Sequence, residues 1–151
     1  MRRRTYLGTL LSLGVGSLAG CIGGSPEAAN EFDYETMSVS GVEVPLAPLS
    51  DVIEWYESDD AVFVDTRHEM DFEESRIADA VLSPARDGQE ENDPVEELPE
   101  STRLVTYCRC PHALATSRGS KLIEEGYAHT YALDEGFDAW IEAGYPVEGS
   151  A

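Results

Sequence analysis

The sequence predicts an α/β domain with a mainly parallel central sheet flanked by helices. Between residues 39 and 148, short apolar runs alternate with amphipathic stretches. One run, residues 61–65, is apolar up to its final acid, which is typical of a strand buried on both faces. Two of the helical stretches end in glycine, at Gly126 and Gly144. Strands that alternate with helices favour a parallel sheet.

The first half of the domain is expected to contain two helices and two strands. In residues 49–57 the apolar side chains recur at helical spacing, and Ser50 or Asp51 stands near the helix start. The strand at residues 61–65 follows. A short helix is expected at residues 71–75 and a second strand at residues 80–83.

The second half begins with a β-rich stretch at residues 103–107 that leads directly into Cys108. Residues 114–125 are expected to form a helix, because Gly126 can adopt the left-handed conformation that commonly ends helices. A strand at residues 130–133 and a last helix at residues 134–143 complete the domain.

The amino terminus has the layout of an export signal. Arg2, Arg3 and Arg4 precede an uncharged stretch to Gly20 that is too short to span a bilayer comfortably. The run Arg3-Arg4-Thr5-Tyr6-Leu7 resembles a twin-arginine signal. We therefore expect residues 1–20 to be a signal peptide.

A lipid anchor is expected directly after this signal. Leu18-Ala19-Gly20-Cys21 resembles a lipobox, in which Cys21 is lipidated and becomes the mature amino terminus. Residues 21–38 are expected to form a flexible tether, and residues 39–151 the folded domain. The protein would then be an exported lipoprotein on the outer face of the cell membrane, which it contacts only through its lipid.

The charge of the chain is extreme and narrows the choice of partners. Ten Lys and Arg stand against thirty Asp and Glu, a formal net charge of −20, which becomes −23 without the three leader arginines. Such a surface repels nucleic acid and anionic headgroups. It suits high salt, and with the export signal it favours a haloarchaeal source. Residues 89–100, the most acidic stretch, are expected to form a solvated loop.

The most informative motif is the pair Cys108 and Cys110 between a strand and a helix. Ligands of open α/β sheets bind at the carboxyl ends of the strands, where helix amino termini converge. Backbone N–H groups at such a site favour thiolate over thiol, and Arg109 and His112 add positive charge. We therefore expect Cys108 to be a reactive sulfur that solvent can reach.

Several spaced motifs resemble those of the rhodanese-like domain family, over about residues 46–147. A strand followed by Asp-x-Arg, a small-residue strand ending in Pro84, the strand entering the cysteine loop and a long carboxyl-terminal block occur in the family's order. In sequence they are FVDTRHEMDFEESRI, ADAVLSP, LVTYCRC and LIEEGYAHTYALDEGFDAWIEAGYPV. The last block is the most specific.

The resemblance implies a sulfurtransferase that carries sulfane sulfur as a persulfide on Cys108. The donor would be thiosulfate or a polysulfide, and the acceptor a thiol or a cyanide-like nucleophile. Asp65 and Arg67 would brace the loop's surroundings, with Asp71 as a partner of Arg67. No cofactor or metal is expected, and the protein is expected to be a monomer. The remaining loop residues implied are Arg109, Cys110, Pro111, His112 and Ala113.

The loop departs from the family pattern at two points. Pro111 stands where the family commonly has Gly, so one backbone donor is missing. The distance to Gly126 is one residue too long from Cys108 and one too short from Cys110, so spacing does not choose between the two sulfurs. Cys108 is favoured because it directly follows the strand. Arg76 and Asp79 also replace the His and Gly that often flank the central Ile77.

Other functions remain open. The two cysteines could serve thiol–disulfide chemistry, or with His112 bind a metal, although no second cysteine cluster supplies a fourth ligand. A non-catalytic binding module is a further alternative. Phosphatase chemistry of the Cys-x5-Arg type is disfavoured, because the required positions hold Leu114 and Thr116.

Overall fold

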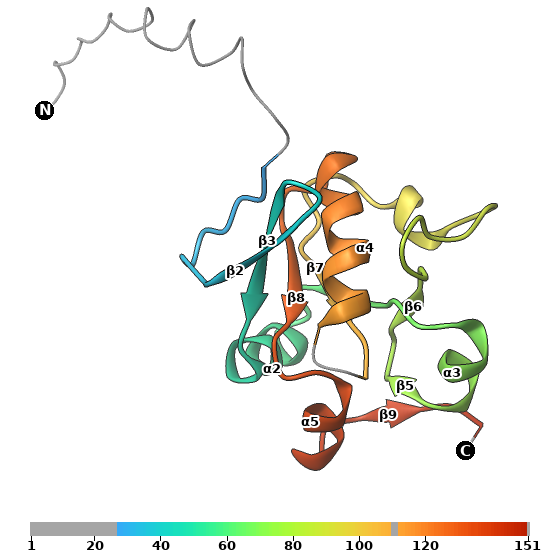
Figure 1. Cartoon of the computed structure of the whole chain (residues 1–151). Helices are drawn as coiled ribbons and strands as arrows, with labels where there is room; N and C mark the ends of the chain where they lie inside the picture. Colours follow the sequence, from blue (N-terminus) through green and yellow to red (C-terminus); the bar gives the residue numbers. More distant parts are fainter. Residues whose placement is uncertain (1–26, 110–111, 151) are drawn as a thin grey trace, which may run out of the picture.

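The computed structural model describes residues 27–109 and 112–150. Its main sheet has six strands in the order β2-β3-β8-β7-β4-β6, and all neighbours pair in parallel except β2 and β3 (Figure 1). The predicted α/β class with a mainly parallel sheet is confirmed. The strands are β2 Thr36–Val39, β3 Val42–Ala47, β4 Val62–Asp65, β6 Val81–Leu82, β7 Leu104–Tyr107 and β8 Thr130–Leu133.

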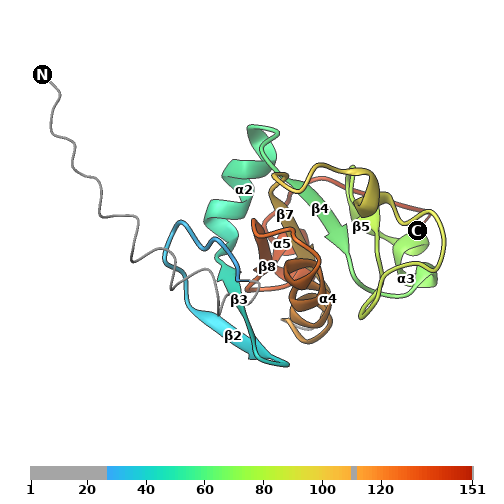
Figure 2. The same cartoon turned by 90° about the horizontal axis from the view of Figure 1, so that it is seen from above.

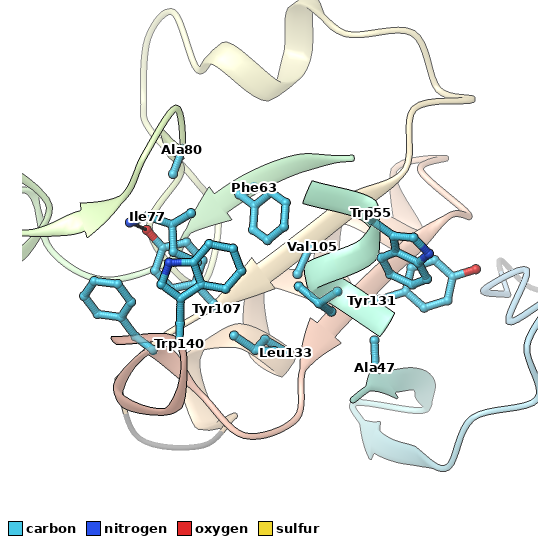
Figure 3. Close-up of a cluster of buried hydrophobic side chains, with 12 residues drawn as sticks. Ala47, Trp55, Phe63, Ile77, Ala80, Val105, Tyr107, Tyr131, Leu133 and Trp140 are labelled. Carbon is cyan, nitrogen blue, oxygen red and sulfur yellow. Dashed lines mark hydrogen bonds between the residues drawn. The ribbon is translucent and has the colours of Figure 1, made fainter. Parts of the chain in front are cut away.

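Helices cover both faces of this sheet (Figure 2). Helix α4, Ala113–Glu124, packs on one face through Ala115, Leu122 and Ile123. Helices α2, Leu49–Glu57, and α5, Phe137–Glu142, pack on the other face, with the buried aromatic rings of Figure 3 between them and the strands. The remaining elements are α3 Glu69–Glu74, the 3₁₀ helix η1 Pro94–Glu97 and the small antiparallel pair β5 Arg76–Ile77 and β9 Val147–Glu148.

The side chains of the central strand β7 alternate between the two layers. Leu104 packs in the cluster that contains Leu122 of α4, whereas Val105 and Tyr107 join the cluster that contains Trp140 of α5. All four residues of β7 are buried, as expected for a strand covered on both faces. Cys108 continues the alternation, so its side chain faces the α4 layer.

The predicted helices and strands are present: α2 and β8 have the predicted bounds, and the other boundaries are shifted by at most three residues. Gly126 (φ 113°) follows α4 and Gly144 (φ 84°) follows α5, each in the left-handed region. Helix α5 starts at Phe137 rather than at residue 134, because Gly136 (φ 86°) is not helical. The hairpin β2–β3 and the β5–β9 pair were not predicted.

The predicted flexible tether is too long at its carboxyl end. Residues 36–38 belong to β2, and the segment before it is fastened to the domain. The N–H of Ala29 donates to the carbonyl of Ala128 (2.7 Å), Phe32 packs against Trp55, and the hydroxyl of Tyr34 donates to Asp51 (2.6 Å). The signal peptide, Cys21 and the tether up to residue 26 lie outside the described residues.

The acidic stretch at residues 89–100 is mostly a surface loop, but it contains one buried carboxylate. Asp93 accepts hydrogen bonds from Ser83 Oγ (2.7 Å) and the N–H of Gln89 (2.7 Å), and it lies 3.8 Å from Arg118 of α4. Asp93 therefore fastens this loop to α4. Within the part of the chain that the structure describes, no helix is long and apolar enough to cross a bilayer.

Helix α4 approaches the sheet closely at Gly119. A Cβ atom there would stand 3.2 Å from Val44 Cγ1 and 3.6 Å from Thr106 Oγ1. We predict that Gly119→Leu lowers the free energy of unfolding by about 1–3 kcal/mol, because the larger side chain forces the helix off the sheet. Denaturant unfolding measures this change. The control Glu124→Leu, at an exposed position of α4, should stay within about 0.5 kcal/mol of wild type.

Candidate active site

The cysteine loop leaves β7 at the carboxyl edge of the sheet and enters α4 (Figure 1). Its first residues are held by backbone hydrogen bonds from two neighbouring elements. Thr66, after β4, donates through its N–H (3.1 Å) and its hydroxyl (2.9 Å) to the carbonyl of Tyr107. The N–H of Phe137, the first residue of α5, donates to the carbonyl of Cys108 (2.9 Å). The loop therefore starts between the end of β4 and the start of α5.

The other end of the loop is fixed at the start of α4. The carbonyl of His112 accepts the N–H (2.8 Å) and the hydroxyl (2.6 Å) of Thr116. Ala113, which the sequence assigns to the loop, is the exposed first residue of the helix. Cys110 and Pro111 lie outside the described residues.

Cys108 is fully buried, with 0% of its surface exposed. It packs in an apolar cluster with Val44, Ala115 and Ala132, between the sheet and α4. The expectation that solvent reaches this sulfur in the resting protein is therefore wrong. The reason is the alternation of β7, which directs the residue after Tyr107 into the α4 layer rather than toward the edge.

Both basic side chains of the loop pair with carboxylates that precede or belong to α5. Arg109 forms an ion pair and hydrogen bond with Asp138, and its guanidinium lies 5.5 Å from the ring centroid of Phe137. His112 Nε2 lies 3.5 Å from Asp134 Oδ1. The two basic side chains predicted beside Cys108 are thus turned toward acidic partners; Arg109 carries a positive charge, and His112 carries one only when it is protonated.

Beneath the loop, Asp65 and Arg67 form the predicted buried pair. The Asp65 carboxylate accepts from the backbone N–H (3.0 Å), Nε (2.9 Å) and Nη2 (2.8 Å) of Arg67, and from the hydroxyl of Tyr107 (3.1 Å). The hydroxyl of Tyr107 in turn accepts the N–H of Ile77 (3.0 Å). Asp65 at the end of β4 therefore joins Arg67, the end of β7 and β5.

The charges of this network hold its members in fixed protonation states. Burial raises the pKa of Tyr107 well above its usual range, and the negative charge of Asp65 raises it further. Burial lowers the pKa of Arg67, but its hydrogen bond to Asp65 and the charge of that carboxylate outweigh burial and raise it. Tyr107 is thus a neutral donor and Arg67 a permanent cation at all ordinary pH values.

The predicted partnership of Asp71 with Arg67 is present, but its hydrogen bond runs through the backbone of Asp71, whose carboxylate acts on Arg67 only through its charge. Arg67 Nη2 donates to the backbone carbonyl of Asp71 (3.4 Å) and to that of Ser75 (2.6 Å), at the end of α3. The carboxylate of Asp71 is not its hydrogen-bond partner among the described residues. Arg67 therefore ends α3 by capping its carbonyl groups, while Asp65 supplies the balancing charge.

Arg118 of α4 is not placed to bind a phosphate. Its side chain is 1% exposed, donates through Nε to Ser83 Oγ (2.9 Å) and lies beside Asp93. This placement supports the exclusion of Cys-x5-Arg phosphatase chemistry. In the described residues, no group of three or more His, Cys, Asp or Glu side chains could hold a metal ion.

Four residues of this region were not assigned from the sequence. They are Tyr107, Asp134, Phe137 and Asp138. The position of Asp134 near the cysteine loop could have been predicted, since this residue directly follows strand 130–133 and the carboxyl ends of parallel strands share one edge. The roles of Tyr107 and Asp138 could not, because they depend on which neighbouring element each side chain faces.

Comparison with known proteins agrees with this architecture. The sequence model of the rhodanese-like domain matches residues 49–143. This match spans more than half of the sequence, and the chain belongs to the rhodanese-like domain family. No curated protein matches the chain.

Solved structures share the fold at low identity. A Bacillus halodurans protein is 23% identical, with a TM-score of 0.61 over 69% of this chain and 76% of that one. The polysulfide-sulfur transferase homodimer of Wolinella succinogenes is 19% identical, with a TM-score of 0.55 over 72% and 80%. A rhodanese-related protein of Thermoplasma volcanium is 18% identical, with a TM-score of 0.54 over 70% and 98%.

Removal of the Asp65 charge tests the buried network. We predict that Asp65→Asn lowers the free energy of unfolding by about 3–5 kcal/mol, because the 6% exposed guanidinium of Arg67 is left without a balancing charge. Denaturant unfolding measures the loss. The matched control Glu148→Gln alters an exposed pair with Arg76 (3.7 Å) and should cost at most about 1 kcal/mol. Equal losses in the two variants would contradict this assignment.

Proposed function

We propose that the protein is a sulfurtransferase whose cysteine loop carries sulfane sulfur as a persulfide. One observation carries the proposal: Cys108 directly follows the central strand at the carboxyl edge of a rhodanese-like sheet, and Cys110 is two residues further along the sequence, before α4. Ligands of α/β sheets bind at this edge. The neighbour from Wolinella succinogenes is a polysulfide-sulfur transferase, which supports this reaction class.

The proposed reaction has two steps that balance without a cofactor. A cysteine thiolate attacks the outer sulfur of thiosulfate; a new S–S bond forms, the S–S bond of thiosulfate breaks, and sulfite leaves with the electron pair. An acceptor thiolate then attacks the outer sulfur of the cysteine persulfide and restores the cysteine thiolate. A polysulfide donor reacts in the same way, with a shortened polysulfide as leaving group.

Cys108 is the proposed carrier, since it directly follows β7. Its burial means that the donor reaches the sulfur only after the loop has moved away from the α4 layer. The same burial favours a second candidate, in which Cys110 accepts the sulfur. Thiol–disulfide chemistry between the two cysteines and a non-catalytic binding role are the other outcomes that an experiment has to separate.

Intact-mass analysis of the reduced protein after thiosulfate treatment separates these functions. We expect wild type to gain the mass of one sulfur atom, Cys108→Ser to gain none, and Cys110→Ser to behave as wild type. Loss of the gain only in Cys110→Ser would transfer the role to Cys110. A loss of two hydrogens that needs both cysteines would indicate redox chemistry.

If no sulfur is added with either thiosulfate or polysulfide, the result would indicate a non-catalytic binding module. Ser is a suitable replacement in both variants because it keeps the size of the side chain while it removes the nucleophilic sulfur.

We further propose that the protein is exported and held at the outer face of the membrane by a lipid on Cys21, and that it works as a monomer in high salt. The contacts of the first described residues support an orientation of the domain in which the cysteine loop faces away from the membrane. Ala29 bonds to Ala128, which precedes β8, at the edge of the sheet opposite to the cysteine loop. A tether leaving there keeps the loop side of the domain open to partners.

The lipid anchor predicts a mature amino terminus at Cys21. Mass analysis of the membrane-extracted protein should find the amino-terminal peptide beginning at Cys21 with an added lipid mass. The variant Cys21→Ser should be recovered without the lipid mass. Wild-type protein that retains residues 1–20 would contradict the lipoprotein assignment.

A further inference from the structure

Residues 134–138, the connection from β8 together with the first two residues of α5, carry three carboxylates, and two of them pair with the cysteine loop. Glu135 is turned away, since its Oε1 accepts the N–H of Leu49 at the start of α2 (2.8 Å). Asp134 pairs with His112, and Asp138 pairs with Arg109. The partners of Asp134 and Asp138 lie on opposite sides of the two undescribed loop residues. The connection therefore holds the loop at both of its ends.

Between these two ion pairs, the backbone supplies a third contact. The N–H of Phe137 donates to the carbonyl of Cys108, and the ring of Phe137 lies between two guanidinium groups. The guanidinium of Arg67 lies 4.8 Å from the ring centroid and pairs with Asp65. Arg109 pairs instead with Asp138. All three contacts join the loop to one short segment, residues 134–138.

These contacts act on Cys108 because its backbone and its side chain are held from different sides. The carbonyl of Cys108 is bound to α5, while its side chain packs in the α4 layer with Val44, Ala115 and Ala132. A sulfur donor cannot reach the fully buried side chain while the loop keeps this position. Loosening Arg109 and His112 from the segment is the least costly way to move it, since both ion pairs are exposed to solvent.

We propose that Asp134 and Asp138 are positioning residues that control access to the Cys108 sulfur. They pair with Arg109 and, when its imidazole is protonated, with His112, the groups that an anionic sulfur donor such as thiosulfate would use. The donor therefore competes with the two carboxylates for Arg109 and His112, and its binding releases the loop. This inference rests on the proposed sulfur transfer to explain why access to Cys108 would be controlled. The experiment that tests it does not require sulfur transfer.

Salt should act on this arrangement in the same direction as the donor. The screening length of water falls from about 10 Å at 0.1 M salt to about 3 Å at 1 M, and exposed ion pairs weaken accordingly. The two pairs are exposed, with side-chain exposures of 52% and 55% for Arg109 and Asp138 and 24% and 45% for His112 and Asp134. High salt would therefore loosen the loop and expose Cys108 more often.

The test is the rate at which iodoacetamide, a neutral reagent, alkylates Cys108 in the reduced full-length chain. Trypsin cleaves after Arg103 and Arg109, so the peptide of residues 104–109 contains Cys108 and no other cysteine. The double variant Asp134→Asn with Asp138→Asn is compared with wild type at 0.1 M and 2 M KCl. The control Asp87→Asn alters an exposed carboxylate that pairs with Lys121, away from the loop.

We expect Cys108 of the double variant to react about two- to tenfold faster than wild type at 0.1 M KCl, the range that two exposed ion pairs support. Wild type and Asp87→Asn should react faster as salt rises, whereas the double variant should change little. A merely structural role of the two aspartates would not remove this salt dependence.

The inference is overturned if the double variant and wild type share both rate and salt dependence. If the double variant is less stable to heat than wild type, the single variant Asp138→Asn decides, because it breaks one pair, keeps the tryptic site at Arg109 and should also accelerate labelling. The measurement needs no sulfur transfer. A protein that takes up no sulfur but shows the expected labelling would refute the proposed function and leave this inference standing.

Discussion

The carboxylate of Asp65 is the interaction on which the carboxyl edge of the sheet depends. It ends β4, takes three donors from Arg67 and accepts a fourth from Tyr107 at the end of β7. Through Arg67 it reaches the last carbonyl groups of α3, and through Tyr107 it reaches β5. A fully buried charge is tolerated only when it is balanced and hydrogen-bonded, and here one carboxylate fixes the base on which the cysteine loop stands.

The burial of Cys108 favours the stability of the fold but disfavours the reaction of its sulfur. The same alternation that buries Leu104 also directs the cysteine side chain into the apolar α4 layer. Apolar burial stabilises the fold but withholds the sulfur from reagents. The pairs of Arg109 with Asp138 and of His112 with Asp134 are of the opposite kind, polar contacts at the surface, and are therefore easily exchanged. Such an arrangement suits a sulfur that is exposed to solvent only from time to time and is buried in the resting protein.

The net charge of the chain gives the loop a particular role. Thirty acids against ten basic residues make most of the surface repellent to an anionic donor. Arg109 and His112 bring two of the few basic side chains together at the carboxyl edge of the sheet. Arg109 pairs with Asp138, and His112 pairs with Asp134 when it is protonated; in the proposed arrangement a competing anion or high salt would weaken these pairs. Local charge, rather than net charge, decides what this edge can bind.

The sequence alone determined the order of the central helices and strands, the mainly parallel sheet and the position of Cys108 after the central strand, but not the β2–β3 hairpin or the β5–β9 pair. These features depend on local periodicity and on the rule that parallel strands end at one edge. The tertiary structure decided what local patterns cannot encode. It buried Cys108 and Asp93, gave Arg67 backbone carbonyls in place of the Asp71 carboxylate, and brought Asp134 and Asp138 to the loop. Each of these depends on which side chains from distant parts of the chain meet across a layer, and that is set only when the helices have packed onto the sheet.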